Sequence, residues 1–329
     1  MSARTFHVGR PRFDARRRED GITVAETVAP RYAYLTTTVP KEFVHRASIA
    51  EVMLTDWERL DDSHFTVAGQ WPRRHGFFAA IDDCYDPLLV IETIRQVGIL
   101  LAHAEFAVPL GHQFLMRDLS VDVRPEHLVI GSTPASVDIE ITCIDIKRRG
   151  HRLSSLHFEA VIYRDEQVAA TAVASFTCTS PAVYRRLRAP RIGDGAPTPL
   201  PLTSPTAPQE VGRTSPTDVV LSPLPEPDRW QLRVDTRHPV LFDHPVDHVP
   251  GMLLLEAARQ AAAAFLGRSC LPVGITGEFS RYAELDAPCV IEVTALPRCA
   301  QGRERLLVTG RQEGALVFTS AISVAPPCA

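Results

Sequence analysis

The sequence has few lysines, no closely paired cysteines and no excess of positive charge. Its formal net charge is −4, so it lacks the basic character that binding to nucleic-acid phosphates requires, and no nucleic-acid partner is expected. Only Lys41 and Lys147 are lysine among the 35 basic residues, so an arginine inside an apolar segment is the informative kind of cation. The seven cysteines are scattered and never spaced as C-x-x-C, which indicates neither a disulfide framework nor a metal site. We therefore expect a cytoplasmic location and no cofactor.

Long uninterrupted hydrophobic runs are also missing. Residues 1–30 carry several arginines but no apolar core, so they lack the hydrophobic region of a signal peptide and are interpreted as an arm. The two most apolar stretches are interrupted by Glu92 and Arg95 and by Glu256 and Arg259, which a membrane-spanning helix tolerates poorly. No membrane segment is expected.

A change in composition divides the chain into two parts. Its 329 residues are 45% hydrophobic, which suits two ordinary globular domains. Between Pro181 and Pro216 the sequence becomes rich in arginine and then in proline and threonine, which predicts a linker without regular helix or sheet. We expect an N-terminal arm at 1–30, a first domain at 31–184, the linker at 185–210 and a second domain at 211–329.

The two domains, called here the first and second halves, resemble each other in sequence. The triplet Glu92-x-x-Arg95-Gln96 returns as Glu256-x-x-Arg259-Gln260, in the same order relative to the other repeated residues. Those others are Val44, Arg46, Ser48, Glu51, Val52 and Leu54, echoed by Val211, Arg213, Ser215, Asp218, Val219 and Leu221, and Arg73 and Phe78, echoed by Arg237 and Phe242. The chain therefore contains an internal duplication.

Each half is predicted to consist of one buried helix and an antiparallel sheet. Residues 86–103 and 250–265 are apolar on nearly every face apart from the Glu/Arg/Gln triplet, which is typical of a buried helix. Asp86 is suited to cap the first of these helices. Downstream, apolar and polar residues alternate with a period of two, as in 137–141, 156–162 and 290–295. This order of elements predicts an α+β unit in which a sheet wraps a helix.

Two motifs resemble known families. The segments WPRRHGFF (71–78) and DPLLVIETIRQVGILLAHAEFAVPLGHQFLM (86–116) are similar to the A-factor biosynthesis family of γ-butyrolactone and butenolide synthases. The run from His244 to Leu253, followed by Glu256, Ala257 and Gln260, resembles the loop and helix of hydroxyacyl-carrier-protein dehydratases, although the stretch from His244 to Pro250 is shorter. The first resemblance covers both halves, from about Val44 to Val324.

The resemblance implies a double hotdog fold and a particular reaction. A β-ketoacyl group would pass from acyl carrier protein or coenzyme A to dihydroxyacetone phosphate, giving precursors of lactone, butenolide or furan signalling molecules. A dehydratase or thioesterase acting on acyl thioesters, or a lactone-binding regulator without catalysis, are the alternatives. A homodimer is possible.

Acyl transfer to a hydroxyl needs a base, donors for an oxyanion and a cation for the acceptor phosphate. Glu92 and Arg259 are the predicted catalytic residues, because burial is expected to raise the pKa of Glu92 and Arg259 is expected to reach the phosphate or Glu92. The backbone amides at the N-terminal end of the first helix, near Pro87 to Leu89, are candidates for the oxyanion donors. The predicted substrate-binding residues are Arg95, Glu256, His75, His244, Gln96 and Gln260.

A structural interpretation of the same residues stays open. Glu92 with Arg95, and Glu256 with Arg259, have the i, i+3 spacing of helical ion pairs that stabilise a helix crossing. The two glutamines are better suited to holding these pairs than to contacting substrate, and His75 and His244 are equally well explained as solvated loop residues. His112 and Asp118 are weaker candidates for the pocket lining, and no cysteine has a basic neighbour that would make it a nucleophile.

Overall fold

The computed structural model describes residues 36–150, 152–192, 198–299 and 302–325, of which residues from Thr37 onward form one compact unit. The predicted arm at 1–30 lies outside the described residues. The first half contains β1 (Leu54–Arg59), β2 (His64–Trp71), α1 (Pro87–Ala104), β3 (Gln113–Val123), β4 (Ala135–Arg149), β5 (Arg152–Arg164) and β6 (Gln167–Thr179). The second half contains β7 (Leu221–Pro223), β8 (Arg229–Leu232), α3 (Gly251–Leu266), β9 (Pro272–Phe279), β10 (Cys289–Leu296), β11 (Glu304–Gln312) and β12 (Ala315–Val324).

Between the halves, α2 spans Pro181–Ile192, inside the stretch where regular helix was not expected. That prediction was wrong because proline is compatible with the first turn of a helix, where Pro181 stands, and Pro190 falls in the last turn. Short 3-10 helices lie at Lys41–Val44, Ile49–Glu51, Pro125–His127, Pro208–Val211 and Pro216–Asp218.

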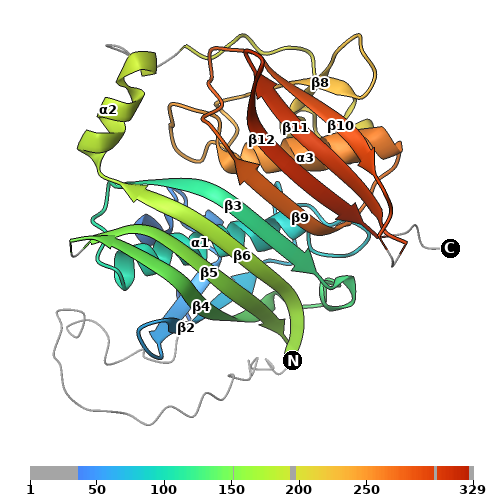
Figure 1. The fold of residues 1–329 in the computed structure, drawn as a ribbon. Coiled ribbons are helices and arrows are strands. Elements are labelled where there is room, and N and C mark those ends of the chain that lie inside the picture. The colour runs from blue at the N-terminus through green and yellow to red at the C-terminus, as the bar shows by residue number, and fades with distance from the viewer. Residues whose placement is uncertain (1–35, 151, 193–197, 300–301, 326–329) are drawn as a thin grey trace, which may run out of the picture. The chain divides into compact units, whose positions relative to one another are not determined.

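All twelve strands form one antiparallel sheet in the order β1-β2-β4-β5-β6-β3-β9-β12-β11-β10-β8-β7. The two halves meet edge to edge where β3 pairs with β9, with Leu119 opposite Gly277 and Val121 opposite Ile275. Figure 1 shows this joint, and α1 and α3 lying behind the strands of their own halves. The structure confirms the predicted double hotdog fold.

Helix α1 begins as the sequence predicts. The side chain of Asp86 accepts a hydrogen bond from the backbone N–H of Leu88 (2.9 Å), and Pro87 occupies the first turn. Near the middle of the helix, Gly98 lies so close to the sheet that a Cβ there would be 2.9 Å from the ring of Phe176. Among the described helices, α1 alone is long and apolar enough to cross a membrane, but 89% of that stretch is buried within the fold.

The period-two pattern of the predicted strands is confirmed in both halves. In β4 the side chains of Val137, Ile139 and Ile141 are buried, while their neighbours are exposed or half-buried. A hairpin turn at 312–314 joins β11 to β12, with residues Glu313 and Gly314 at positive φ. The inward faces of the strands and the two helices form one continuous core.

Candidate active site

A buried carboxylate at the centre of α1 is bound by three side chains. Glu92 is fully buried and accepts hydrogen bonds from Arg46 Nε (3.0 Å), from Arg95 Nε (2.8 Å) and Nη2 (2.8 Å), and from Gln96 Nε2 (2.7 Å). Arg46 Nη2 also lies 2.6 Å from Glu92 Oε1. We call these four residues the first cluster. Three of them were predicted, and Arg46 was not assigned a role although it belongs to the repeated residues.

The second half contains the same arrangement. Glu256, also fully buried, is bound by Arg213 Nε (2.8 Å), by Arg259 Nε (2.9 Å) and Nη2 (2.7 Å), and by Gln260 Nε2. We call these four residues the second cluster. The structure thus brings together the predicted triplet of each half, as i, i+3 ion pairs, and adds to each an arginine from a loop between two short 3-10 helices far away in the sequence.

The two glutamines fix the backbone that precedes β1 and β7. Gln96 accepts a hydrogen bond from the N–H of Met53 (2.9 Å) and donates to the carbonyl of Glu51 (2.7 Å). Gln260 makes the corresponding bonds with Val220 N–H (3.0 Å) and the carbonyl of Asp218 (2.7 Å). With their amide groups engaged in this way, both glutamines act as positioning residues.

The pKa of Glu92 departs from its usual value in the direction opposite to the prediction. Burial by itself would raise the pKa, but the guanidinium groups of Arg46 and Arg95 outweigh burial and hold it well below its usual range. The same balance, with Arg213 and Arg259, lowers the pKa of Glu256 to about 2. Both carboxylates are therefore ionised, and the expectation of a raised pKa suited to a general base was wrong because it omitted the second arginine.

The clusters also join the halves, through the arginines that the sequence left unassigned. Arg46 Nη1 donates to the carbonyl of Val240 (3.3 Å) in the second half, and Arg213 Nη1 donates to the carbonyl of Phe77 in the first. Arg259 was expected to reach across to the acceptor phosphate or to Glu92. Its hydrogen bonds instead go to Glu256 and to the carbonyl of Val211, both in its own half.

The two clusters differ in their access to solvent. The side chain of Arg95 is 18% exposed, whereas that of Arg259 is 3% exposed. Next to the second cluster, the Arg213 guanidinium lies 4.2 Å from the ring centroid of Phe77, and its Nη2 is 3.9 Å from the buried carboxylate of Asp86. The second cluster is thus enclosed by protein. The side chain of Arg259 is too buried to support the catalytic role predicted for it, and that role stays a prediction.

His75 and His244 occupy different environments. The buried His75 accepts backbone hydrogen bonds from Phe77 and Phe78 at Nδ1, and its Nε2 lies 3.3 Å from Glu51. Its counterpart in the second half is His238, which makes the same contacts with Val240 and Leu241 and with Asp218. His75 is therefore a buried residue that positions the loop, and the alternative interpretation of a solvated loop histidine was wrong.

His244, in contrast, is 45% exposed and lies against the first half. Its neighbour Asp243 accepts hydrogen bonds from the N–H groups of Ala47 (2.5 Å) and Ser48 (3.2 Å), which fixes the loop beside Arg46. His244 is also among the groups that lower the pKa of His45, after burial, His103 and Arg95. The second half thus contributes Asp243, and the loop that carries His244, to the neighbourhood of Arg46.

A pair of histidines beside Arg95 was missed by the sequence analysis. His45 Nε2 and His103 Nε2 are 2.8 Å apart, and His103 Nδ1 donates to the carbonyl of Val108 (2.7 Å). Both rings pack against Phe114. A signal was present: His45 stands one residue before Arg46, where the repeat has Gly212 before Arg213.

Other candidates do not join this site. The N–H of Leu88 is bonded to Asp86 and the start of α1 is buried, so the expected oxyanion donors at residues 87–89 are not accessible. Asp118 accepts a hydrogen bond from Ser175 on the neighbouring strand β6. Burial raises the pKa values of Cys143 and Cys289 to about 12, which keeps these thiols protonated.

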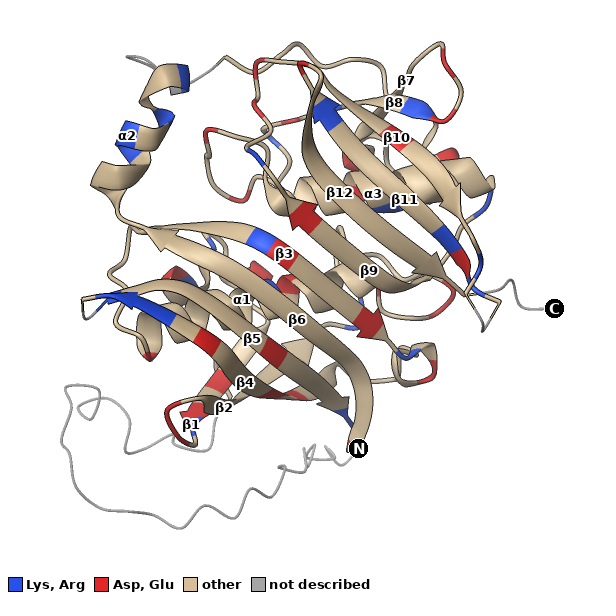
Figure 2. Cartoon of the chain, viewed as in Figure 1, with Lys and Arg blue, Asp and Glu red and all other residues tan. Residues whose placement is uncertain are grey.

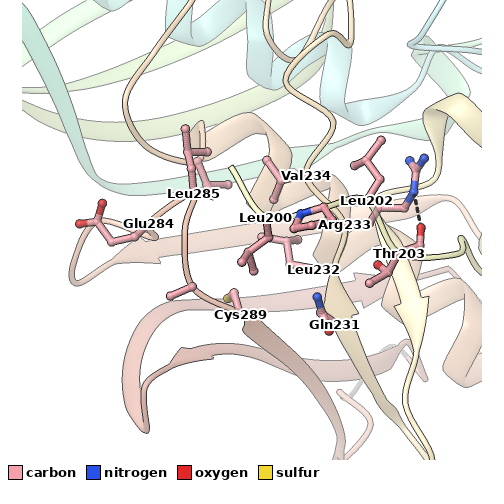
Figure 3. A pocket seen from close by; sticks show the side chains of 13 residues that line it. Leu200, Leu202, Thr203, Gln231, Leu232, Arg233, Val234, Glu284, Leu285 and Cys289 are labelled. Carbon is pink, nitrogen blue, oxygen red and sulfur yellow. Dashed lines mark hydrogen bonds between the residues drawn. The ribbon is translucent and has the colours of Figure 1, made fainter. Parts of the chain in front are cut away.

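Two hollows lie in the second half, and neither is lined by a cluster residue. One is a cavity of about 20 Å³ whose lining mixes apolar residues such as Leu232 and Leu285 with polar ones such as Gln231 and Glu284 (Figure 3). That volume holds roughly one water molecule. A second, open hollow of about 340 Å³ lies between Tyr282 and the end of α2.

The comparisons with known proteins agree with the fold described above and also indicate a protein family. The A-factor biosynthesis hotdog domain matches residues 28–180 and again 196–325. A 2-oxo-3-(phosphooxy)propyl 3-oxoalkanoate synthase of Streptomyces virginiae is 54% identical over 289 residues, which cover 88% of this chain and 98% of the relative. A protein with the same name from Streptomyces coelicolor is 42% identical and is covered to 91% of its length, against 87% of this chain.

Solved structures with a similar fold include two thioesterases. The acyl-ACP thioesterase from Bacteroides thetaiotaomicron superimposes with a TM-score of 0.51 at 10% identity, over 79% of this chain and 98% of that one. The 12:0-ACP thioesterase from Umbellularia californica gives a TM-score of 0.50 at 11% identity, over 79% and 94%. These likenesses establish the fold alone. The family match over both halves and the close relatives together show that the chain belongs to the A-factor biosynthesis hotdog family.

Proposed function

We propose that this protein transfers the acyl group of a β-ketoacyl thioester to the hydroxyl of dihydroxyacetone phosphate, at the exposed side of the first cluster. The observation that carries the proposal is the 54% identity to a 2-oxo-3-(phosphooxy)propyl 3-oxoalkanoate synthase over 98% of that relative's length. That name describes an ester between a 3-oxo acid and the free hydroxyl of dihydroxyacetone phosphate. The reaction belongs to the biosynthesis of γ-butyrolactone and related signalling molecules.

The chemistry consists of one bond exchange and one proton transfer. The acceptor hydroxyl attacks the thioester carbonyl, the new C–O bond forms, the C–S bond breaks, and the hydroxyl proton ends on the departing thiol. No electron donor or acceptor is required. The protein must hold the hydroxyl against the carbonyl, accept its proton and neutralise the acceptor phosphate.

The first cluster supplies a cationic group, and the loop of the second half that lies next to Arg46 supplies an imidazole. Arg95 is partly exposed and fixed in orientation by Glu92, so its guanidinium suits the acceptor's phosphate or carbonyl oxygen. His244 supplies an exposed imidazole from the other half. Glu92 serves to hold Arg46 and Arg95, because an ionised carboxylate with a lowered pKa is a poor proton acceptor. We assign the turnover to this cluster and a structural role to the second.

The donor is an acyl carrier protein or coenzyme A thioester made in the cytoplasm, where we also place the enzyme. Purified protein incubated with a β-ketoacyl thioester should release thiol only when dihydroxyacetone phosphate is present, with a new phosphorylated ester in the mass spectrum. Equal thiol release without the phosphate would identify a thioesterase. Absence of any turnover, with lactone binding retained, would identify a regulator.

A further inference from the structure

The backbone at His45 adopts a conformation that side chains rarely take. Its φ is 51°, in the left-handed region, where an L-residue brings its Cβ close to the backbone. The equivalent position in the second half is Gly212, with φ 66° and no such conflict. The same bend in the chain is therefore made by glycine in one half and by histidine in the other.

The residue at this position controls the arginine beside it. A Cβ on Gly212 would lie 3.3 Å from Arg259 Nη1, so the guanidinium of Arg259 occupies the space that a side chain would need. In the first half the equivalent position carries the side chain of His45, and Arg95 is partly exposed. The second cluster, which is enclosed by protein, therefore has glycine at this position, and the partly exposed first cluster has a strained histidine.

The hydrogen bonds of the histidine pair determine which ring nitrogens carry protons. A carbonyl only accepts, so His103 Nδ1 must carry the hydrogen that it donates to Val108. In the neutral ring His103 Nε2 is then the acceptor, and His45 Nε2 must be the donor across 2.8 Å. This leaves His45 Nδ1 as a lone pair, and no hydrogen bond from a described residue engages it.

The surroundings keep this lone pair available at any working pH. Burial lowers the pKa of His45 to about 3, and three nearby groups act in the same direction: His103 and Arg95 on α1, and His244 before α3. The ring is only part-buried. Next to it, Arg95 uses Nε and Nη2 for Glu92, and no described residue bonds to its Nη1. Arg95 Nη2 also donates to the carbonyl of Val44 (3.3 Å), the residue before His45, so an acceptor and a cationic donor occupy neighbouring positions.

We propose that His45 Nδ1 accepts the hydrogen bond of the attacking hydroxyl of a small hydroxyketone phosphate whose carbonyl or phosphate oxygen is bound by Arg95. The inference rests on the proposed function and makes it more specific. His45 stays neutral and orients the hydroxyl through this hydrogen bond, because a ring whose pKa is lowered to about 3 is a poor proton acceptor. As the C–O bond forms and the C–S bond breaks, the hydroxyl proton passes to the departing sulfur. The second cluster, with glycine at this position, binds no acceptor.

His45→Gly is the decisive variant, because it gives the first half the residue that the second half already has. The imidazole is removed while the backbone strain is relieved, so the thermal unfolding midpoint should stay close to that of the parent. Turnover with a β-ketoacyl thioester should fall by about 10²-fold. The KM for dihydroxyacetone phosphate should rise, and that for the thioester should be unchanged.

Free imidazole should restore part of the activity of His45→Gly by occupying the vacated space. The matched control is Asp165→Gly, which relieves the same left-handed conformation (φ 50°) in the exposed β5–β6 turn. The control should keep full turnover and show no response to imidazole. If His45→Gly fails to fold, His45→Asn carries the test, since asparagine tolerates this conformation, and it should also lose at least about tenfold.

Full activity in a folded His45 variant would overturn the inference while leaving the proposed function standing. So would a loss that imidazole does not restore and that raises both KM values equally, since a packing role would produce it. If the unsubstituted protein forms no ester from dihydroxyacetone phosphate, the proposed function itself fails.

Discussion

At the scale of single residues, Glu92 holds two arginines inside the protein, so its charge should matter for stability. We expect Glu92→Gln to lower the free energy of unfolding by about 3–5 kcal/mol, because Arg46 and Arg95 would lose the anion that compensates their burial. Urea unfolding monitored by circular dichroism measures the change. Glu42→Gln, at an exposed position, is the control and should have no effect. A variant that lost activity at unchanged stability would instead support a direct catalytic role.

The two buried carboxylates also predict how stability depends on pH. In the folded state the pKa values of Glu92 and Glu256 lie below those in the unfolded chain, and the pKa of Glu256 is lowered to about 2. In acid the unfolded state therefore binds more protons than the folded state. Their contribution is complete above roughly pH 5 and is lost as pH falls toward 2. Burial raises the pKa of Asp86, which acts in the opposite sense but is one group against two. Urea midpoints measured from pH 7 to pH 3 should fall below pH 5, and a midpoint that rose there would contradict the ion-pair assignment.

At the site, the sequence allowed only the contacts between residues of the same helix to be predicted. The i, i+3 pairs could be predicted because helix geometry places Glu92 beside Arg95. The sign of the pKa shift could not, since it depends on Arg46, which lies 46 positions away along the chain and reaches Glu92 only in the folded protein. The distinction between Arg95 and Arg259 was hidden for the same reason, because exposure is set by neighbours from both halves.

At the scale of elements, α2 depends on one buried arginine. Arg188 bonds to the carboxylates of Asp247 and Glu284 and lies 4.3 Å from the ring centroid of Tyr282, whereas Arg185 on the same helix is exposed. Figure 2 shows the basic residues along this helix. Arg188→Ala should detach α2, which would appear as faster amide hydrogen exchange in residues 181–191. Arg185→Ala should leave the exchange unchanged, and equal protection in both variants would contradict the anchoring role.

The elements themselves were largely predictable, and α2 shows where prediction fails. Helices and strands with a strong apolar period were found because each buries one face within its own half. Helix α2 has little apolar surface, and its attachment comes from Arg188 meeting acidic groups far along the chain. Proline content was therefore the strongest local signal in that stretch, and it favoured the wrong conclusion.

At the scale of the whole molecule, the β3–β9 joint and the crossed arginines should make the halves unfold together. Trp71 is fully buried in the first half and Trp230 is buried in the second, so each can report on its own half. In variants that retain only one of these two tryptophans, with Trp57 replaced in both, fluorescence should give coincident urea transitions. Separate midpoints would show that the joint does not couple the halves. The pairing of β3 with β9 could not be predicted from the sequence, because the residues of an edge strand do not identify the strand with which it pairs.

The duplication lies within a single chain, and this has an evolutionary consequence. When two identical subunits build a symmetric enzyme, every substitution appears in both sites, so neither can change alone. Covalent fusion removes that constraint. One copy can then accumulate changes that favour turnover, including a side chain that weakens the fold, while the other changes toward tighter packing and compensates for the loss. Gly212 and His45 occupy the equivalent left-handed position in the two halves, and they are the kind of difference that such independent change produces.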